Sequence, residues 1–397
     1  MKLVHLLGHN PNWNTEIYFE QNVGDEFLIT AFTFGNNYYK HKRVSQVLEK
    51  SMIDLQFYGH KESAKLSKGK LSEFDFHPAK IFTDIELSKQ ELHNSVVKAI
   101  IYQSESRFNK IIIPAFYEDE NIESFISIVK SINRFLRENK VNRKEYYMTV
   151  PLAYDIIRNK ENVERLLFEL TDFNICFDGY FIVCENKPEQ GQKISNDIKI
   201  IRNLSRFFCV LKNQRFKTIY AYANWDALFY LAQTDIDYIT IGTYENLRNF
   251  FIRRFTDDIS GGASDGYYFS EQLLNMIRAK DLISLRSNNI IGMVENRKNI
   301  FSDIILGENY VWNIHKPEVN KNYLLSISHL LKQVSKIYPI RNRKIHVLFL
   351  IESAIQKYNK IREKYVHLQN ESRNYHLDVW KMHLLKKVDM KPDDFET

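Results

Sequence analysis

Two acidic side chains in this sequence could take part in acid–base chemistry. Glu185 directly follows the apolar run at residues 179–184, and Asp54 lies inside the apolar run at residues 52–57. Burial in apolar surroundings raises the pKa of a carboxyl group and suits it to exchange protons near neutral pH. The structural alternatives are an ion pair of Glu185 with Lys187 and an outward-facing Asp54 that caps a helix. We predict Glu185 and Asp54 as the catalytic pair.

Other aromatic and polar side chains also follow apolar runs and could contact a ligand. The cluster of Tyr220, Tyr222, Asn224 and Trp225 offers flat rings for stacking and an amide for hydrogen bonding to a planar or sugar ligand. Aromatic core packing is the alternative, because the chain contains 27 Phe and 23 Tyr. The predicted ligand-binding residues are Tyr58, Tyr117, Asp178, Tyr222, Asn224, Trp225 and Arg248.

Familiar catalytic and cofactor motifs are missing or out of context. Residues 262–266 match the G-x-S-x-G string, but a polar, glycine-rich stretch precedes them where a nucleophile elbow needs a buried strand. His5 and His9 cannot share a helix, because Gly8 and Pro11 interrupt it. The sequence has no Walker A, G-x-G-x-x-G or C-x-x-C motif. We therefore expect no metal and no cofactor.

The elements that must position these residues are short apolar runs alternating with amphipathic stretches. Near-continuous apolar runs are typical of parallel strands that are buried on both faces. The expected strands are residues 3–7, 27–34, 52–57, 111–116, 146–150, 179–184, 218–222 and 238–241, and the expected helices between them include 121–139, 162–170, 197–211 and 225–233. This alternation predicts an α/β fold, a (β/α)8 TIM-type barrel, with an open doubly wound sheet as the main rival. In such a barrel the site lies at the carboxyl ends of the strands.

The chain after the last expected strand has a different character. A Gly- and Ser-rich stretch at residues 256–266 is typical of a loop, and helical patterns follow at 270–285, 322–337 and 344–387. We predict a barrel over residues 1–269 and a helical C-terminal region over residues 270–397. A polar insertion at residues 58–83 is expected near the barrel mouth.

Composition narrows the partners and the compartment. The net charge of +6 over 397 residues is a weak bias that permits nucleic acid, tRNA or DNA, without requiring it. The C-terminal helices carry interleaved Lys and Arg, which could contact phosphates or protein partners or could simply be a solvated face. Three cysteines without C-x-x-C spacing fit a reducing compartment. With no apolar run of about 20 residues and no signal-peptide pattern, we expect a cytoplasmic protein without a membrane partner.

The stretch from Asp178 to Arg248 resembles the second half of the tRNA-guanine transglycosylase-like barrels. Residues 177–180, Phe-Asp-Gly-Tyr, look like that family's base-recognition strand, and residues 219–238 look like its next strand, helix and strand. Asp54 lies roughly where the family has the acid of its Asp-Ser-Gly-Gly-Phe motif. The resemblance implies a (β/α)8 barrel that acts on a base. The small residues of that motif, the zinc ligands and the nucleophilic Asp, whose place is near Thr240, are not retained.

The stretch from Asp178 to Glu185 is also similar to the chitinase-type glycosidase strand D-G-x-D-x-D-x-E. Phe181 and Val183 replace the two middle acids, which in that family tune the catalytic Glu.

Two hypotheses about function result. In the first, the barrel acts on or binds a nucleic-acid base, a nucleoside or a sugar at the strand carboxyl ends. In the second, a non-catalytic barrel is a binding or scaffold subunit of a multi-protein assembly, for which an anti-phage defence system is one setting. The missing motif residues favour the second hypothesis.

Overall fold

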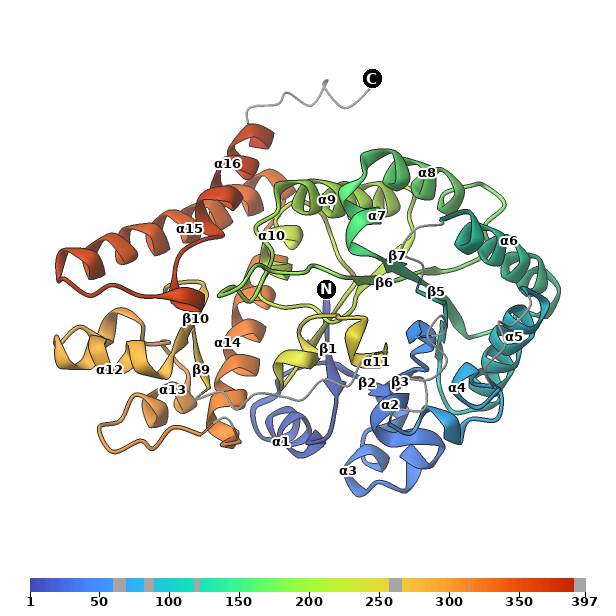
Figure 1. Cartoon of the computed structure of the whole chain (residues 1–397), viewed down its shortest axis with the longest axis horizontal. Helices are drawn as coiled ribbons and strands as arrows, with labels where there is room; N and C mark the ends of the chain where they lie inside the picture. The colour runs from blue at the N-terminus through green and yellow to red at the C-terminus, as the bar shows by residue number, and fades with distance from the viewer. Residues whose placement is uncertain (60–68, 82–88, 118–121, 257–265, 314, 389–397) are drawn as a thin grey trace.

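The computed structural model describes residues 1–59, 69–81, 89–117, 122–256, 266–313 and 315–388. Its core is an eight-stranded parallel sheet in the order β3-β2-β1-β8-β7-β6-β5-β4. The strands are β1 (Lys2–Leu7), β2 (Glu26–Thr30), β3 (Ser51–Asp54), β4 (Lys110–Ile113), β5 (Glu145–Leu152), β6 (Gly179–Cys184), β7 (Lys217–Tyr220) and β8 (Tyr238–Gly242). β3 and β4, the two ends of this order, lie beside each other, so the sheet curls into a nearly closed barrel (Figure 1). The predicted (β/α)8 barrel is confirmed, and the open doubly wound sheet is wrong.

Helices cover the outer face of the barrel (Figure 1), and the strand side chains that point inward are buried in its interior. They are α1 (Pro11–Gln21), α5 (Lys89–Glu105), α6 (Ile122–Asn139), α8 (Lys160–Leu170), α9 (Ile198–Asn213) and α10 (Ala227–Leu231), with the short helices α2 (Ala31–Phe34), α3 (Lys42–Ser45), α4 (Pro78–Ile81), α7 (Tyr154–Arg158) and α11 (Arg253–Thr256) in the connections. In α6, Phe125, Val129 and Ile132 recur at helical spacing and all are buried. α8 begins where the Asn159 side chain accepts a hydrogen bond from the backbone N–H of Glu161.

Besides β4, which ends at Ile113, three strands end earlier than their apolar runs predict. β2 ends at Thr30, and the next residues form α2. β3 ends at Asp54, because the Asp54 carboxylate accepts a hydrogen bond from the backbone N–H of Gln56 at 2.9 Å and the chain turns there. β7 ends at Tyr220, two residues before Tyr222, which adopts a left-handed backbone conformation. The apolar runs continue through all three turns, so hydrophobic pattern alone could not place these ends.

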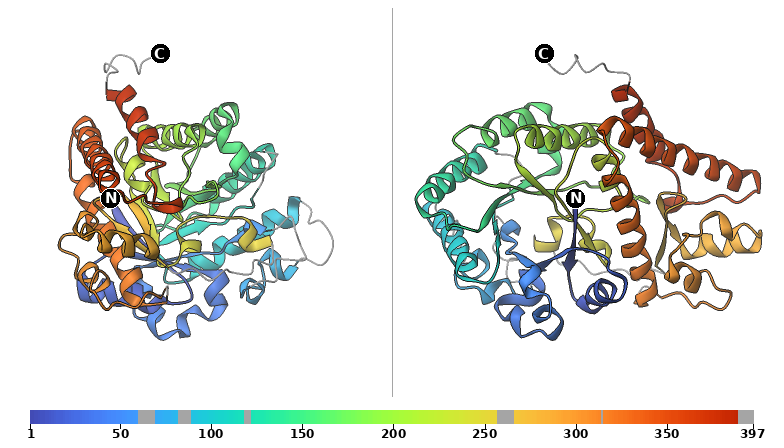
Figure 2. Two further views of the ribbon diagram at one scale, coloured as in Figure 1. Left: turned by 60° about the vertical axis from the view of Figure 1, so that its left-hand side comes forward. Right: turned by 180° about the vertical axis from the view of Figure 1, so that it is seen from behind.

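The C-terminal region packs along one side of the barrel (Figures 1 and 2). It consists of β9 (Tyr267–Ser270), β10 (Asn275–Arg278), α12 (Ala279–Ser287), α13 (Ile300–Ile305), α14 (Pro317–Ser335), α15 (Ile340–Glu363) and α16 (Leu377–Val388). The helix expected at residues 270–285 is wrong in its first part, because β9 and β10 pair there as an antiparallel hairpin. The single stretch expected at 344–387 is two helices, α15 and α16, packed on each other.

Arg343, on α15, ties the C-terminal region to the barrel. Its guanidinium is fully buried and donates to the backbone carbonyls of Leu231 at 3.1 Å and Ser335 at 3.2 Å. The same group pairs with the carboxylate of Asp235 at 2.9 Å. A buried guanidinium needs this many acceptors, so α15 is held in one position relative to α10. The predicted loop at 256–266 and much of the insertion at 58–83 lie outside the described residues.

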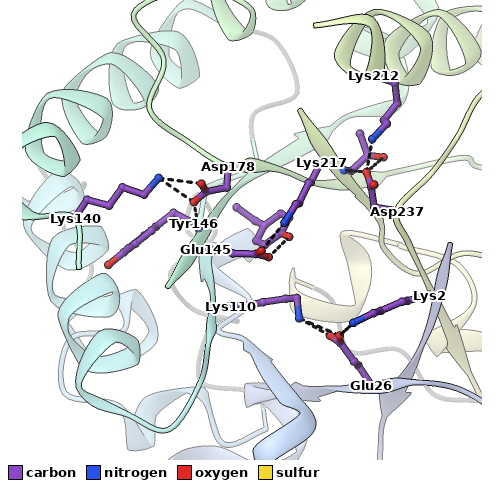
Figure 3. Close-up of polar contacts among 12 residues, drawn as sticks. Lys2, Glu26, Lys110, Lys140, Glu145, Tyr146, Asp178, Lys212, Lys217 and Asp237 are labelled. Atoms are coloured by element: carbon purple, nitrogen blue, oxygen red, sulfur yellow. Dashed lines mark hydrogen bonds and ion pairs between the residues drawn. The ribbon is translucent and has the colours of Figure 1, made fainter. Parts of the chain in front are cut away.

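The amino ends of the strands carry a set of lysine–carboxylate pairs (Figure 3). Glu26 accepts from Lys2 at 2.7 Å and from Lys110 at 2.8 Å, and the Glu26 and Lys110 side chains are largely buried. Lys217 pairs with Glu145 beside them. Because each carboxylate has a lysine partner, these charged side chains can be partly buried at the amino ends of the strands, next to the apolar interior of the barrel.

We expect Glu26→Gln to lower the free energy of unfolding by about 2–3 kcal/mol, because it leaves Lys2 and Lys110 without their shared carboxylate. Urea denaturation at pH 7 measures the change. Glu164→Gln removes the partner of Arg206 in a much more exposed pair, and should have a far smaller effect. Equal effects of the two substitutions would contradict a stabilising role for the buried pair.

Candidate ligand site at the barrel mouth

Asp54 lies in a cage of hydrogen-bond donors at the carboxyl end of β3. Its carboxylate accepts from the Tyr58 hydroxyl at 3.1 Å, the Tyr222 hydroxyl at 3.0 Å and the backbone N–H of Gln56. The Gln56 amide in turn donates to the Tyr222 oxygen at 2.7 Å. Asp54 is only 1% exposed, and burial raises its pKa to about 6 although these hydrogen bonds oppose the shift. Burial also raises the pKa of both tyrosines, so their hydroxyls remain protonated donors.

The backbone around this cage is held in unfavourable conformations. Gln56 and Tyr222 have φ angles of 55° and 52°, and Lys187, which follows β6, has a φ of 34°. Residues other than glycine rarely occupy this left-handed region, and such positions cluster at functional sites. Three turns at the same end of the barrel are therefore held in place by the tertiary structure, and two of them carry side chains of the Asp54 cage.

Glu185 forms a second acid–tyrosine pair at the end of β6. The Glu185 side chain is 2% exposed and accepts from the Tyr117 hydroxyl at 2.6 Å. Lys187 lies 3.5 Å from the same carboxylate, so the ion pair considered from the sequence is present. Each of the two buried acids therefore has a positive charge near it: Lys187 for Glu185, and Arg254 for Asp54, on which it acts through its charge.

The ring of Phe250 lies between the two acid–tyrosine pairs. Ring centroids are 5.0 Å apart for Phe250 and Tyr58, 5.6 Å for Phe250 and Tyr222, and 6.1 Å for Phe250 and Tyr117. Three tyrosines that bond the two carboxylates therefore surround one aromatic ring, supplied by the segment after β8. The mouth brings together five predicted residues: Asp54, Glu185, Tyr58, Tyr117 and Tyr222.

Asn224, Trp225 and Arg248 do not join this group. The Asn224 side chain accepts from the Tyr323 hydroxyl at 2.9 Å, and the Arg248 guanidinium lies 3.6 Å from the centre of the Tyr323 ring. Trp225 packs against Phe269 of β9. The prediction that these three residues contact a ligand is therefore corrected: in the fold they contact the C-terminal region. The sequence pattern could not reveal these contacts, because that region is distant along the chain.

Asp178 is also misplaced by the sequence prediction. It precedes β6, so it lies at the amino end of the strand, away from the mouth (Figure 3). There it pairs with Lys140 at 2.9 Å and accepts from the backbone N–H of Tyr146 at 2.7 Å. It is part of the lysine–carboxylate set at the bottom of the barrel and cannot share a ligand with Asp54.

Sequence reasoning missed two residues of the mouth, Phe250 and Arg254. The Arg254 guanidinium lies over the Phe32 ring, 5.0 Å from its centre, and its charge acts on Asp54 and Tyr222. The signal was the pair of aromatic residues followed by two arginines at positions 250–254, just after the last strand. No motif marks that segment, so only the fold brings it to the mouth.

Within the described ranges, no three His, Cys, Asp or Glu side chains are grouped so that they could hold a metal ion. None of the helices in the described part of the chain combines the length and apolar character needed to cross a bilayer. Comparison with protein-family models, curated proteins and solved structures returned no match. The architecture alone therefore defines the class, a (β/α)8 barrel with an appended C-terminal region.

The raised pKa of Asp54 predicts a specific pH dependence of stability. The carboxyl has a pKa of about 6 in the folded protein and 3.8 as its ordinary value, so ionising it costs the folded state more than the unfolded state. Relative to Asp54→Asn, the wild type should lose about 2 kcal/mol of unfolding free energy as the pH rises from 4 to 7.5.

Chemical denaturation of both proteins across this pH range measures the difference. Asp303→Asn, on the surface of α13, is the control for pH effects that do not depend on burial. A difference between wild type and Asp54→Asn that stays constant with pH would contradict the raised pKa.

Proposed function

We propose that the barrel mouth binds a small polar ligand of the nucleic-acid base, nucleoside or sugar class, and that Asp54 exchanges a proton with it. The observation that carries this proposal is the buried Asp54 carboxylate held by the Tyr58 and Tyr222 hydroxyls. A carboxyl group with a pKa of about 6 is mostly ionised at neutral pH, so it can accept a proton from a ligand O–H or N–H and return it. Glu185 with Tyr117 would be the second acid–base group.

The position of Phe250 supports a planar ligand. Its ring contacts Tyr58, Tyr117 and Tyr222, and a flat base or a sugar face would find the same aromatic surroundings if the Phe250 segment moved aside. A base as ligand would agree with the partial resemblance to tRNA-guanine transglycosylase-like barrels. Binding would then require the segment after β8 to open, as closing loops do in many enzymes.

Asp226 offers a matched control, because it is another buried acid at a strand end. It accepts from the Tyr220 hydroxyl at 2.7 Å, and burial raises its pKa to about 6. Tyr220, however, packs on Phe208 of α9, outside the barrel. A raised pKa alone therefore does not mark the site, whereas position at the mouth separates Asp54 from Asp226.

We expect Asp54→Asn and Glu185→Gln to weaken ligand binding or turnover at least about tenfold, because each removes a charged hydrogen-bonding group from the mouth. Thermal-shift screening of the wild type with free bases, nucleosides and monosaccharides finds the ligand, and calorimetry compares the variants. Asp226→Asn should keep the affinity of the wild type even where it lowers stability. If both mouth variants bind like the wild type, or no member of these classes binds, the proposal is wrong.

A second candidate function is a binding subunit, and an exposed apolar face on α15 and α16 favours it. Phe349 is 66% exposed and Leu385 41% exposed, on helices joined by the Lys381–Glu352 ion pair at 3.5 Å. The exposed Arg341, near the start of α15, adds positive charge to that helix. The partner that fits is a protein with an acidic surface around an apolar patch.

Combining Phe349→Ser and Leu385→Ser in one protein tests this second function. We expect this double variant to lose a partner that the wild type retains in affinity purification from its own cells, quantified by mass spectrometry, while its circular dichroism is unchanged. Ile283→Ser is the control, because Ile283 is an exposed apolar residue on a different helix, α12. This variant should retain the partner. Retention by the double variant, or loss of the partner on nuclease treatment, would contradict a protein-docking role for this face.

A further inference from the structure

Arg254 holds a buried hydrogen-bond donor that nothing in the described structure uses. Its Nη1 donates to the backbone carbonyl of Asn246 at 3.1 Å, and its guanidinium is stacked over Phe32. Its Nη2 is buried and has no hydrogen-bond partner among the described residues. An unpartnered, buried and charged donor is costly, and a ligand that accepts a hydrogen bond from it would remove that cost.

Asp54 does not fill this role. Asp54 is close enough for its charge to act on Arg254, but both Asp54 oxygens already accept hydrogen bonds from Tyr58, Tyr222 or Gln56. The charge of Arg254 thus balances Asp54 through space and leaves Nη2 available. An acceptor that reached Nη2 would have to come from outside the described part of the protein.

His9, which follows β1, is a second group that can carry positive charge. Its side chain keeps contact with solvent, and partial burial of the ring and the charge of Arg254 both lower its pKa. Two such groups disfavour each other's positive charge. An anion bound at Nη2 would give that atom its acceptor and would relieve this repulsion.

We propose that Arg254 and His9 form an anion subsite at the barrel mouth that takes the phosphate group of the ligand. This inference deepens the proposed function and rests on it for the rest of the ligand: the ligand is a nucleotide or a sugar phosphate, with its neutral part toward Asp54 and Phe250. A phosphate suits the subsite because its several oxygens can accept from two donors that come from different loops, after β1 and after β8.

Calorimetry of the full chain with inorganic phosphate, ribose 5-phosphate, ribose and acetate tests the subsite. We expect the two phosphate compounds to bind and ribose to bind far more weakly. Arg254→Gln should weaken phosphate binding roughly ten- to a hundredfold, and His9→Gln should weaken it by a smaller factor. Arg253→Gln, one residue away, is the control and should bind phosphate as the wild type does.

Four outcomes decide the matter. Equal phosphate binding by the wild type and Arg254→Gln, or no binding of either phosphate compound, overturns the subsite. Acetate binding as tight as phosphate binding overturns the phosphate assignment. If Arg254→Gln does not fold, Arg254→Lys and His9→Gln decide, with weakened phosphate binding expected for both and wild-type binding overturning the proposal. Asp54→Asn removes a negative charge that acts on Arg254, so it should not weaken phosphate binding, and failure of the acid–base role and failure of the subsite give different results.

Discussion

The structure depends on the burial of a parallel sheet on both of its faces. Once eight strands close into a barrel and helices cover the outside, charged side chains are left mainly at the strand ends. The two ends solve this problem differently. At the amino ends, lysines and carboxylates pair, as Glu26 does with Lys2 and Lys110. At the carboxyl ends, the acids Asp54 and Glu185 are bonded by tyrosine hydroxyls.

This difference has a chemical consequence. At the amino ends, burial alone would raise the pKa of Glu145, but the hydrogen bond and charge of Lys217 lower it, so this carboxylate stays ionised and serves stability. A carboxylate bonded by neutral hydroxyls in a buried place keeps a pKa closer to neutrality, as Asp54 does, and can gain or lose a proton. The left-handed turns at Gln56 and Tyr222 place the amide and hydroxyl groups that bond Asp54, so backbone conformation helps to position this buried acid.

The C-terminal region changes the meaning of several mouth residues. Tyr323 of α14 bonds Asn224 and lies against Arg248, so these polar residues join two parts of the chain. The segment after β8 supplies both Phe250, which fills the mouth, and Arg254, which carries the unused donor. A single connection thus closes the site and offers a contact for an anion, which links access to recognition in the proposed function.

The sequence by itself determined the barrel. A strand that is buried on both faces needs a near-continuous apolar run, and such a run can be recognised in the local sequence without knowledge of distant contacts. It also pointed to Asp54 and Glu185, since an acid within or directly after an apolar run is placed where it becomes buried, and for Asp54 burial raises the pKa to about 6. Tertiary structure decided which strand-end residues meet. Asp178 lies at the amino ends of the strands, and Asn224, Trp225 and Arg248 contact the C-terminal region. Asp226 has a raised pKa like that of Asp54, but it is bonded by Tyr220, which packs on α9. Phe250 and Arg254 became visible only in the fold, because contact between the segment after β8 and Asp54 spans about half of the chain. Side-chain direction at a turn and contacts over such separations leave no periodic trace in a sequence, and for this protein they define the candidate site.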